Sequence, residues 1–143
     1  MLGYADLGAS LGRSPDLGAS RWLYAQVAVL TTARSAGLVA IDGPHLGVAV
    51  DDGFVAGVEH AVALGFDGKW VIHPRQIDTV IDASTPSAAE TANAQIVIDA
   101  LRAAHETNRG AIAVDGRMID EALAVSARRL LARAHRGQTE GLD

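Results

Sequence analysis

Three polar side chains stand at positions where a parallel sheet would gather them. Asp6, Asp42 and His73 each close a short apolar run and precede a loop or the start of a helix. In folds built from parallel strands, ligands bind at the edge where the carboxyl ends of the strands meet. A carboxylate suits a hard cation such as Mg²⁺, which makes Asp6 a candidate metal ligand. The pattern therefore predicts a site at the carboxyl edge of a sheet.

The same residues also have structural interpretations, and the residues alone leave both open. Asp6 could accept backbone N–H bonds where a loop begins, and His73 could be fixed by Pro74 next to it. No second histidine lies at ligand spacing from His73, which argues against a metal role for it. Asp120 stands where a final helix begins, so it could simply stabilise the helix dipole.

The lysine and the other histidines carry weaker signals. Lys69 is the sole lysine, and we expect it at the amino end of its strand, in a structural role, paired with a carboxylate. The remaining histidines are scattered and are interpreted as solvated or structural; they are His45, His60, His105 and His135. No Gly-rich phosphate loop and no Ser/His/Asp triad can be assigned.

The first part of the chain alternates between short apolar runs and amphipathic stretches. Glycine, proline and capping residues set the limits of the expected elements. We expect strands at residues 1–6, 38–42 and 69–73, loops at 8–20 and 43–50, helices at about 20–37 and 51–65, and a further helix from Pro74. The inward faces of the first two helices are expected to carry Leu23, Val27 and Leu30, and Phe54, Val58 and Val62.

After a break at residues 84–86, the pattern becomes mainly helical. Ser87 and Glu90 form a capping-box signature for a long helix that Gly110 would end. An extended piece at 111–114 and a turn at 115–116 follow. The last helix is expected at about 119–134, with Leu123, Leu130 and Leu131 inward, and a polar tail begins at 137.

This order of elements predicts an α/β fold. Strands that alternate with helices indicate a parallel sheet with right-handed crossovers. Three βα units fall short of the eight in a closed TIM barrel and would leave a sheet face and two edges uncovered. From the pattern alone, the chain is therefore either a small open α/β domain or a piece of something larger, and residues 137–143 are expected to form a flexible tail.

Composition excludes several classes of protein. Hydrophobic residues make up 49% of the 143 residues and charged residues 20%, which is typical of a globular chain. A formal net charge of −5 argues against nucleic-acid binding. There is no cysteine, no membrane-spanning apolar run and no signal peptide, so cytoplasm is expected by elimination.

Five motifs together resemble the HpcH/HpaI aldolase and citrate lyase β-subunit family. In chain order they are GYADLG, AIDGPH, LGFDGKWVIHPRQI, TPSAAE and VDGRMID. The resemblance runs from about residue 1 to 134. Residues 65–77 are the most specific part, and they are most similar to the malyl-CoA / β-methylmalyl-CoA lyase branch.

The resemblance implies that residues 1–84 are part of a TIM (β/α) barrel. It also implies that residues 85–136 form a C-terminal helical extension, which packs on a neighbouring subunit of a homo-oligomer. It implies a lyase that makes or breaks a carbon–carbon bond beside a CoA thioester, with Mg²⁺ holding a 2-oxo acid. By motif position, Asp6 matches a metal ligand and Asp120 an acid/base residue. Asp42, Pro44, His73 and Pro74 match positions that line the acyl-CoA site.

The resemblance also implies that the barrel is incomplete in this chain. The family's metal-binding Glu and substrate-binding Arg lie on strands upstream of the one matched by residues 1–6. An apolar strand at the first residue likewise favours a fragment. We therefore expect little or no lyase activity from these 143 residues alone. Two alternatives stay open: a thioesterase acting on malyl-CoA, and a non-catalytic module that binds a partner chain through exposed sheet edges.

Overall fold

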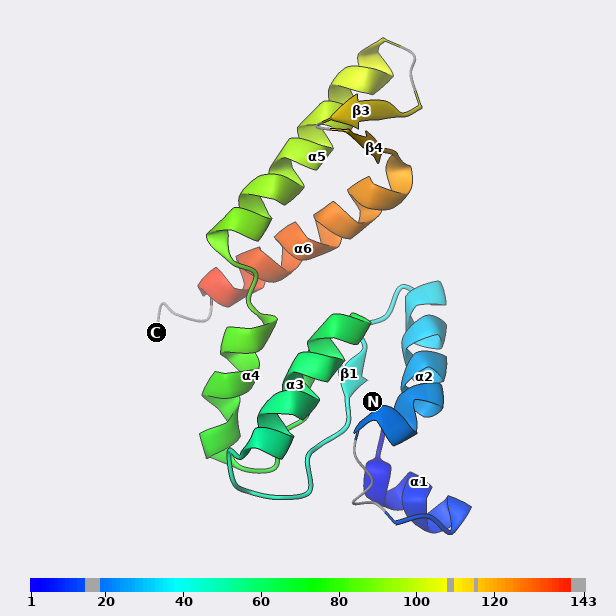
Figure 1. The fold of residues 1–143 in the computed structure, drawn as a ribbon, viewed down its shortest axis with the longest axis vertical. Coiled ribbons are helices and arrows are strands. Elements are labelled where there is room, and N and C mark those ends of the chain that lie inside the picture. Colours follow the sequence, from blue (N-terminus) through cyan, green and yellow to red (C-terminus); the bar gives the residue numbers. More distant parts are fainter. Residues whose placement is uncertain (15–18, 108–109, 115, 140–143) are drawn as a thin grey trace. The chain divides into compact units, whose positions relative to one another are not determined.

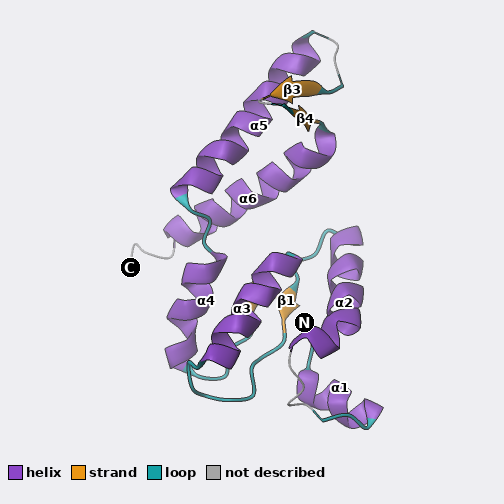
Figure 2. Cartoon of the chain, viewed as in Figure 1, coloured by secondary structure: helices purple, strands orange, loops and turns teal. Residues whose placement is uncertain are grey.

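The structure is a computed structural model that describes residues 1–14, 19–107, 110–114 and 116–139. The chain divides into two compact units, Met1–Ser84 and Thr85–Asp143, and each is described by itself. The fold is mixed α/β, mostly helical with a few short strands, as Figures 1 and 2 show. The strands form one parallel and one antiparallel pair in the part of the chain described.

The first unit contains one parallel strand pair among helices. Its elements are α1 (Tyr4–Leu11), a 3₁₀ helix (Ala19–Trp22), α2 (Leu23–Ser35), β1 (Ile41–Asp42), α3 (Asp52–Leu64), β2 (Gly68–Lys69), a 3₁₀ helix (Pro74–Gln76) and α4 (Ile77–Ser84). The register pairs Ile41 with Gly68 and Asp42 with Lys69. The parallel pairing of the second and third expected strands is therefore confirmed, although both are shorter than expected.

The helix between the two strands follows the sequence pattern closely. Asp51 caps α3, its Oδ1 accepting the backbone N–H of Phe54 at 2.8 Å. Phe54 and Val58 are buried as expected. Gly65 ends the helix with φ +98°, a left-handed conformation that residues with a side chain rarely adopt. These local signals place α3 so that it connects β1 to β2.

The prediction of a strand at residues 1–6 is wrong, because α1 begins at Tyr4. Leu2 and Tyr4 are buried against Trp22, but the apolar run ends there. Gly3 is extended, and its carbonyl accepts the N–H of Leu7 at 2.9 Å, which starts a helix. The helix continues to Leu11, inside the expected loop at 8–20, of which residues 15–18 lie outside the described part.

The inward face of α2 also differs from the prediction. Leu23 and Val27 are 42% and 41% exposed, whereas Gln26 is fully buried. The buried face is shifted by one residue, which is a rotation of about 100° around the helix axis. Gln26 is turned inward because its side chain amide bonds to buried polar groups of two other elements. Val29 and Leu30 pack against the neighbouring hydrophobic clusters, so the predicted inward position of Leu30 is retained.

The third strand is shorter and begins earlier than expected. β2 ends at Lys69, and the Trp70 N–H makes a last bond to the Asp42 carbonyl at 3.0 Å. The chain then bends toward the 3₁₀ helix at Pro74, leaving Trp70 and Ile72 about half exposed. The predicted helix start at Pro74 is confirmed.

The second unit is a helical hairpin with a small antiparallel strand pair at one end. Its elements are α5 (Ala88–Glu106), β3 (Ile112–Val114), β4 (Arg117–Ile119) and α6 (Glu121–Thr139). The capping box is confirmed: the Ser87 hydroxyl accepts the Glu90 N–H, and the Glu90 carboxylate accepts the Ser87 N–H. α5 ends at Glu106, before Gly110.

Alanines and larger aliphatic side chains together form the core of the second unit. Leu101, Ile119 and Ala124 make the core, and Ala127 is also buried. Leu123 is 43% exposed, contrary to the predicted inward face. The expected polar tail is helical through Thr139, and residues 140–143 lie outside the described part.

Among the described residues, no helix is both long and apolar enough to cross a membrane.

The capping box predicts a measurable stability effect. Ser87→Ala removes the acceptor for the Glu90 N–H and should lower the free energy of unfolding by about 1 kcal/mol. Ser126→Ala is the matched control, because that exposed hydroxyl bonds only the carbonyl of its own helix at Ala122. Urea denaturation followed by circular dichroism measures both, and equal stability of the two variants would contradict the prediction.

Candidate functional site

A buried carboxylate at the end of β1 is the centre of the polar interior of the first unit. Asp42 is fully buried, and its two oxygens accept from different elements. Oδ1 accepts the Tyr4 hydroxyl at 2.6 Å, and Oδ2 accepts the Lys69 ammonium at 2.7 Å. The strand register places Lys69 directly opposite Asp42. Burial and close pairing make this a strong, poorly screened ion pair.

Lys69 is enclosed on several sides. Its side chain is 5% exposed, its ammonium also donates to the Gly43 carbonyl at 2.8 Å, and it lies 5.7 Å from the centre of the Tyr4 ring. The prediction that Lys69 pairs with a carboxylate is confirmed. Its predicted position at the amino end of the strand is wrong, because β2 ends at Lys69.

Gln26 extends this network to two more helices. Its Nε2 donates to the Tyr4 hydroxyl at 2.7 Å and to Asp42 Oδ1 at 3.3 Å, and its Oε1 lies 3.1 Å from His60 Nε2. We call Tyr4, Gln26, Asp42 and Lys69 the Asp42 network. The sequence analysis missed Tyr4 and Gln26. The available signal was a lone glutamine within an otherwise apolar helical stretch.

The Asp42 network changes the ionisation of Tyr4. Burial, the hydrogen bond to Asp42 and the negative charge of Asp42 raise the pKa of the Tyr4 hydroxyl far above its usual value. The neutral hydroxyl is kept as a donor because an ionised phenolate would face a carboxylate inside the protein.

Asp6 lies on α1, two residues after Tyr4, and its side chain is exposed. Its carboxylate lies over the preceding turn, since a Cβ built on Gly3 would stand 3.0 Å from Asp6 Oδ2. Within the described residues, no three His, Cys, Asp or Glu side chains gather closely enough to hold a metal ion. Mg²⁺ is usually held by one or two carboxylates with other oxygen ligands. The described residues therefore do not make a magnesium site by themselves.

The segments that carry Pro44 and His73 are joined by a buried glutamine. Gln76 is fully buried; its Nε2 donates to the Gly47 carbonyl at 2.8 Å, and its Oε1 accepts the Ile72 N–H at 3.2 Å. The loop after β1 is thereby held against the chain after β2. Sequence analysis did not identify Gln76, because it lies in an ordinary helix-start sequence.

His73 has a local structural role. Its Nδ1 accepts the Arg75 N–H at 3.2 Å, which caps the 3₁₀ helix that Pro74 begins. The imidazole is part-exposed, and Pro44 is part-buried in the loop that follows Asp42 and Gly43. His73, Pro74 and Pro44 thus lie on neighbouring segments that follow the paired strands β2 and β1.

Asp120 belongs to the second unit and caps α6. It follows β4, and its Oδ1 accepts the Leu123 N–H at 3.1 Å. The structure thus gives Asp120 a local role at the start of α6, whereas its expected acid/base role stays a prediction. The next residue, Glu121, pairs with Arg128, which lies seven residues later on the same face of α6. The cap fixes the direction of the Asp120 side chain while leaving it partly exposed.

Comparison with protein families and known sequences gives consistent results. A family model described as HpcH/HpaI aldolase/citrate lyase matches residues 1–74. Citrate lyase subunit beta of Escherichia coli K12 is 36% identical over 122 residues, covering 85% of this chain and 40% of that protein. The L-malyl-CoA/beta-methylmalyl-CoA lyase of Cereibacter sphaeroides ATCC 17025 is 32% identical over 136 residues, covering 83% of this chain and 43% of that protein.

Two solved structures agree with these matches. CitE from Mycobacterium tuberculosis, in complex with magnesium, acetoacetate and coenzyme A, has a TM-score of 0.72 and 33% identity, covering 93% of this chain and 50% of that chain. RipC from Yersinia pestis has a TM-score of 0.57 and 32% identity, and the match covers 62% of this chain and 40% of the RipC chain. The chain therefore spans between two fifths and one half of the length of these relatives.

The Asp42 network predicts a large effect of removing its cation. Lys69→Met leaves the Asp42 carboxylate buried without a counter-ion and should cost about 3–5 kcal/mol of unfolding free energy. Adding Asp42→Asn should recover part of that loss because no uncompensated charge then remains. Asp99→Asn, in an exposed pair with Arg102, is the control and should change stability by less than about 0.5 kcal/mol. Urea denaturation checks all three, and a Lys69→Met effect as small as the control's would contradict a strong buried pair.

The raised pKa of Tyr4 predicts a stability loss in alkali. Below about pH 10 the hydroxyl is neutral in both states, and its contribution to stability is fully present. Above that pH the unfolded chain ionises and the folded chain does not, so the free energy of unfolding falls. Tyr4→Phe should be less stable at neutral pH but show a shallower alkaline decline. The measurement is the denaturation midpoint of both proteins from neutral pH to above about pH 10. If the midpoints of the two proteins fall in parallel as the pH rises, the proposed ionisation of Tyr4 is contradicted.

Proposed function

This chain belongs to the HpcH/HpaI aldolase/citrate lyase family, and on that basis we propose that it is part of a carbon–carbon lyase acting on a hydroxyacyl-CoA thioester. The observation that carries the proposal is the match to CitE, a protein crystallised with magnesium, acetoacetate and coenzyme A, over 93% of this chain. The matches to citrate lyase subunit beta and to a malyl-CoA lyase support the same class of reaction. We further propose that these residues form part of a TIM barrel with a helical extension.

The proposed reaction cleaves the bond between a hydroxyl-bearing carbon and the carbon beside the thioester carbonyl. A base removes the hydroxyl proton, the carbon–carbon bond breaks, and the hydroxyl-bearing carbon becomes the carbonyl of a 2-oxo acid. The electron pair of the broken bond remains on the other carbon as an acyl-CoA enolate, which takes up a proton. For malyl-CoA the products are glyoxylate and acetyl-CoA.

We assign the acid/base role to Asp120. General acid–base catalysis needs a carboxylate held in a fixed direction within reach of the reacting proton. The bond from the Leu123 N–H to Asp120 Oδ1 gives this residue a defined direction. As the resemblance implies, its site would be that of a neighbouring subunit in a homo-oligomer.

Pro44, His73 and Pro74 are proposed to line the site for the acyl-CoA. They lie on the segments after β1 and β2, which Gln76 holds together. Asp42 is proposed to act on the same site indirectly, because its carboxylate is fully buried and bonded to Tyr4, Gln26 and Lys69. By holding Lys69 on the Gly43 carbonyl, it fixes the start of the loop that carries Pro44.

Magnesium would require ligands beyond those described here. We propose Asp6 as one carboxylate ligand, with the others supplied by residues outside this chain. A single exposed carboxylate binds Mg²⁺ weakly, so the 143 residues alone are expected to have little or no lyase activity.

A second candidate is a non-catalytic module that binds another chain. The first unit exposes large apolar side chains, including Tyr24 (90%), Trp70 (50%) and Ile81 (47%). Such surfaces are often covered by another polypeptide. Strong self-association that does not depend on Mg²⁺, with no activity in any context, would favour this candidate over the lyase.

A chimera tests the lyase proposal. In the Cereibacter sphaeroides malyl-CoA lyase, the segment matching this chain would be replaced by residues of this chain, and glyoxylate release from malyl-CoA with Mg²⁺ would be measured. We expect activity in the chimera and little or none in the 143-residue chain. Asp120→Asn should reduce chimera turnover by about 100-fold or more, because asparagine preserves the helix cap but cannot exchange the proton.

The controls separate the alternatives. Asp82→Asn, an exposed residue of α4 with no part in the proposed site, should leave chimera turnover unchanged. A folded but inactive chimera beside an active host enzyme would argue against the lyase proposal. Turnover by the 143-residue chain alone would contradict the expectation that it needs further residues for activity. Release of free malate in place of glyoxylate would assign a thioesterase.

A further inference from the structure

A small hollow lies between α5 and α6 in the second unit. Its volume is about 220 Å³, and it is lined by Ile98, Leu101, Arg102, His105 and Arg128. The apolar part comes from Ile98 and the nearly buried Leu101. The other three lining residues are basic or can become so, and no acidic side chain lines the hollow.

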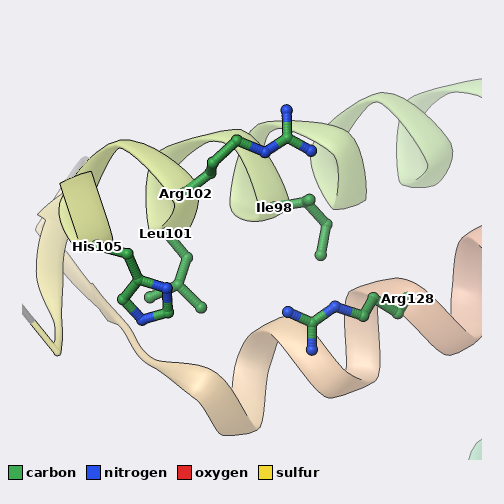
Figure 3. A pocket seen from close by; sticks show the side chains of 5 residues that line it. All are labelled: Ile98, Leu101, Arg102, His105 and Arg128. Carbon is green, nitrogen blue, oxygen red and sulfur yellow. The ribbon is translucent and has the colours of Figure 1, made fainter.

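The basic side chains come from both helices. Figure 3 shows His105 and Arg128 extending toward the space between the helices, from α5 and α6 respectively. Arg102 lies at the outer rim, its guanidinium pointing away from α6. An anion in the hollow would thus have apolar contacts on one side and cationic donors from two elements around it.

Arg102 and Arg128 each pair with a carboxylate, but neither pair occupies all the N–H donors of the arginine. Glu121 pairs with Arg128 Nη1 at 2.5 Å, and Asp99 lies 3.5 Å from Arg102 Nη1. The side chains in both pairs are more than half exposed, where ion pairs contribute little to stability. A guanidinium has five N–H donors, and its planar fork matches the oxygens of a phosphate.

The hollow adjoins the start of α6, where Asp120 lies. The hydrogen bond from Arg128, together with the positive charges of Arg128 and His105, lowers the pKa of the Glu121 carboxyl. Glu121 follows Asp120 directly, so the basic residues of the hollow and the proposed acid/base residue lie at the same end of the helical hairpin.

We propose that this hollow binds a phosphate group of a small anionic ligand. Its volume is below the roughly 300–1,000 Å³ of pockets that enclose a whole ligand, so it would take one charged group. Resting on the proposed function, we assign that group to the nucleotide part of the coenzyme A thioester, which carries phosphate esters. Arg128 supplies charge-assisted hydrogen bonds, the His105 imidazole supplies a further donor, and Ile98 and Leu101 contact the adjoining carbon atoms.

Binding can be measured directly on the 143-residue chain by ¹H–¹⁵N NMR titration. The probes are coenzyme A, adenosine 3′,5′-bisphosphate, inorganic phosphate and phosphate-free pantetheine. We expect saturable shifts at amides of residues 98–105 and 120–128 with coenzyme A and the bisphosphate, and none with pantetheine. Absence of saturable shifts there, or equal binding of pantetheine, would overturn the proposal.

Three variants at the start and middle of α6 test the assignment to these side chains. Arg128→Gln should weaken binding of coenzyme A at least tenfold, whereas Arg129→Gln, an exposed neighbour outside the lining, should leave it unchanged. Glu121→Gln removes the competing carboxylate and should tighten binding several-fold. An effect of Arg128→Gln no larger than that of Arg129→Gln, or weaker binding by Glu121→Gln, would overturn the proposal. Unchanged thermal midpoints confirm that each variant is folded.

The titration also distinguishes coenzyme A from free phosphate as the ligand, and it is independent of the test of the lyase proposal. Inorganic phosphate that binds as tightly as coenzyme A would support a phosphate site and overturn coenzyme A as its source. The titration involves no turnover, so loss of binding refutes the hollow as a site without bearing on the chimera assay. An inactive chimera with intact coenzyme A binding would instead refute the lyase and keep the site.

Discussion

The buried pair of Asp42 and Lys69 ties together the two strands and the first two α-helices of the first unit. Two charges removed from water are tolerated only when their remaining hydrogen-bonding capacity is satisfied by nearby groups. Tyr4, Gln26 and the Gly43 carbonyl meet that need, and they come from α1, α2 and the loop after β1. The parallel register that places Asp42 opposite Lys69 is therefore coupled to the position of two helices.

This requirement accounts for features that hydrophobic patterning alone would not produce. The chain near its first residues follows Tyr4 into the interior, and α2 presents Gln26 inward while Leu23 and Val27 face out. A half-exposed Trp70 directly follows the buried Lys69. Polar satisfaction outweighs apolar burial at these positions because an unpaired buried charge costs more than an exposed aliphatic side chain.

The second unit depends on close helix packing. Alanines at positions 94, 104, 124 and 127 are buried between or beside α5 and α6, and small side chains let helix backbones approach. The strand pair β3–β4 connects the helices and delivers Asp120 to the start of α6, where the cap directs it. In this unit, the capped carboxylate of Asp120 and the basic side chains of the hollow both belong to the α5–α6 hairpin.

The sequence by itself determined the features that depend on neighbours within one helical turn. Asp51, Ser87 with Glu90, Gly65 and Pro74 start or end helices where predicted, because capping and left-handed glycine act between residues close in the chain. The motifs also identified the family, which the comparisons then showed. Only the tertiary structure decided the helix at Tyr4, the rotation of α2 about Gln26, the place of Lys69 at the end of β2 and the role of Gln76. Each depends on a hydrogen bond or ion pair between residues far apart in the chain, and no local pattern specifies which distant partner a buried polar group will find.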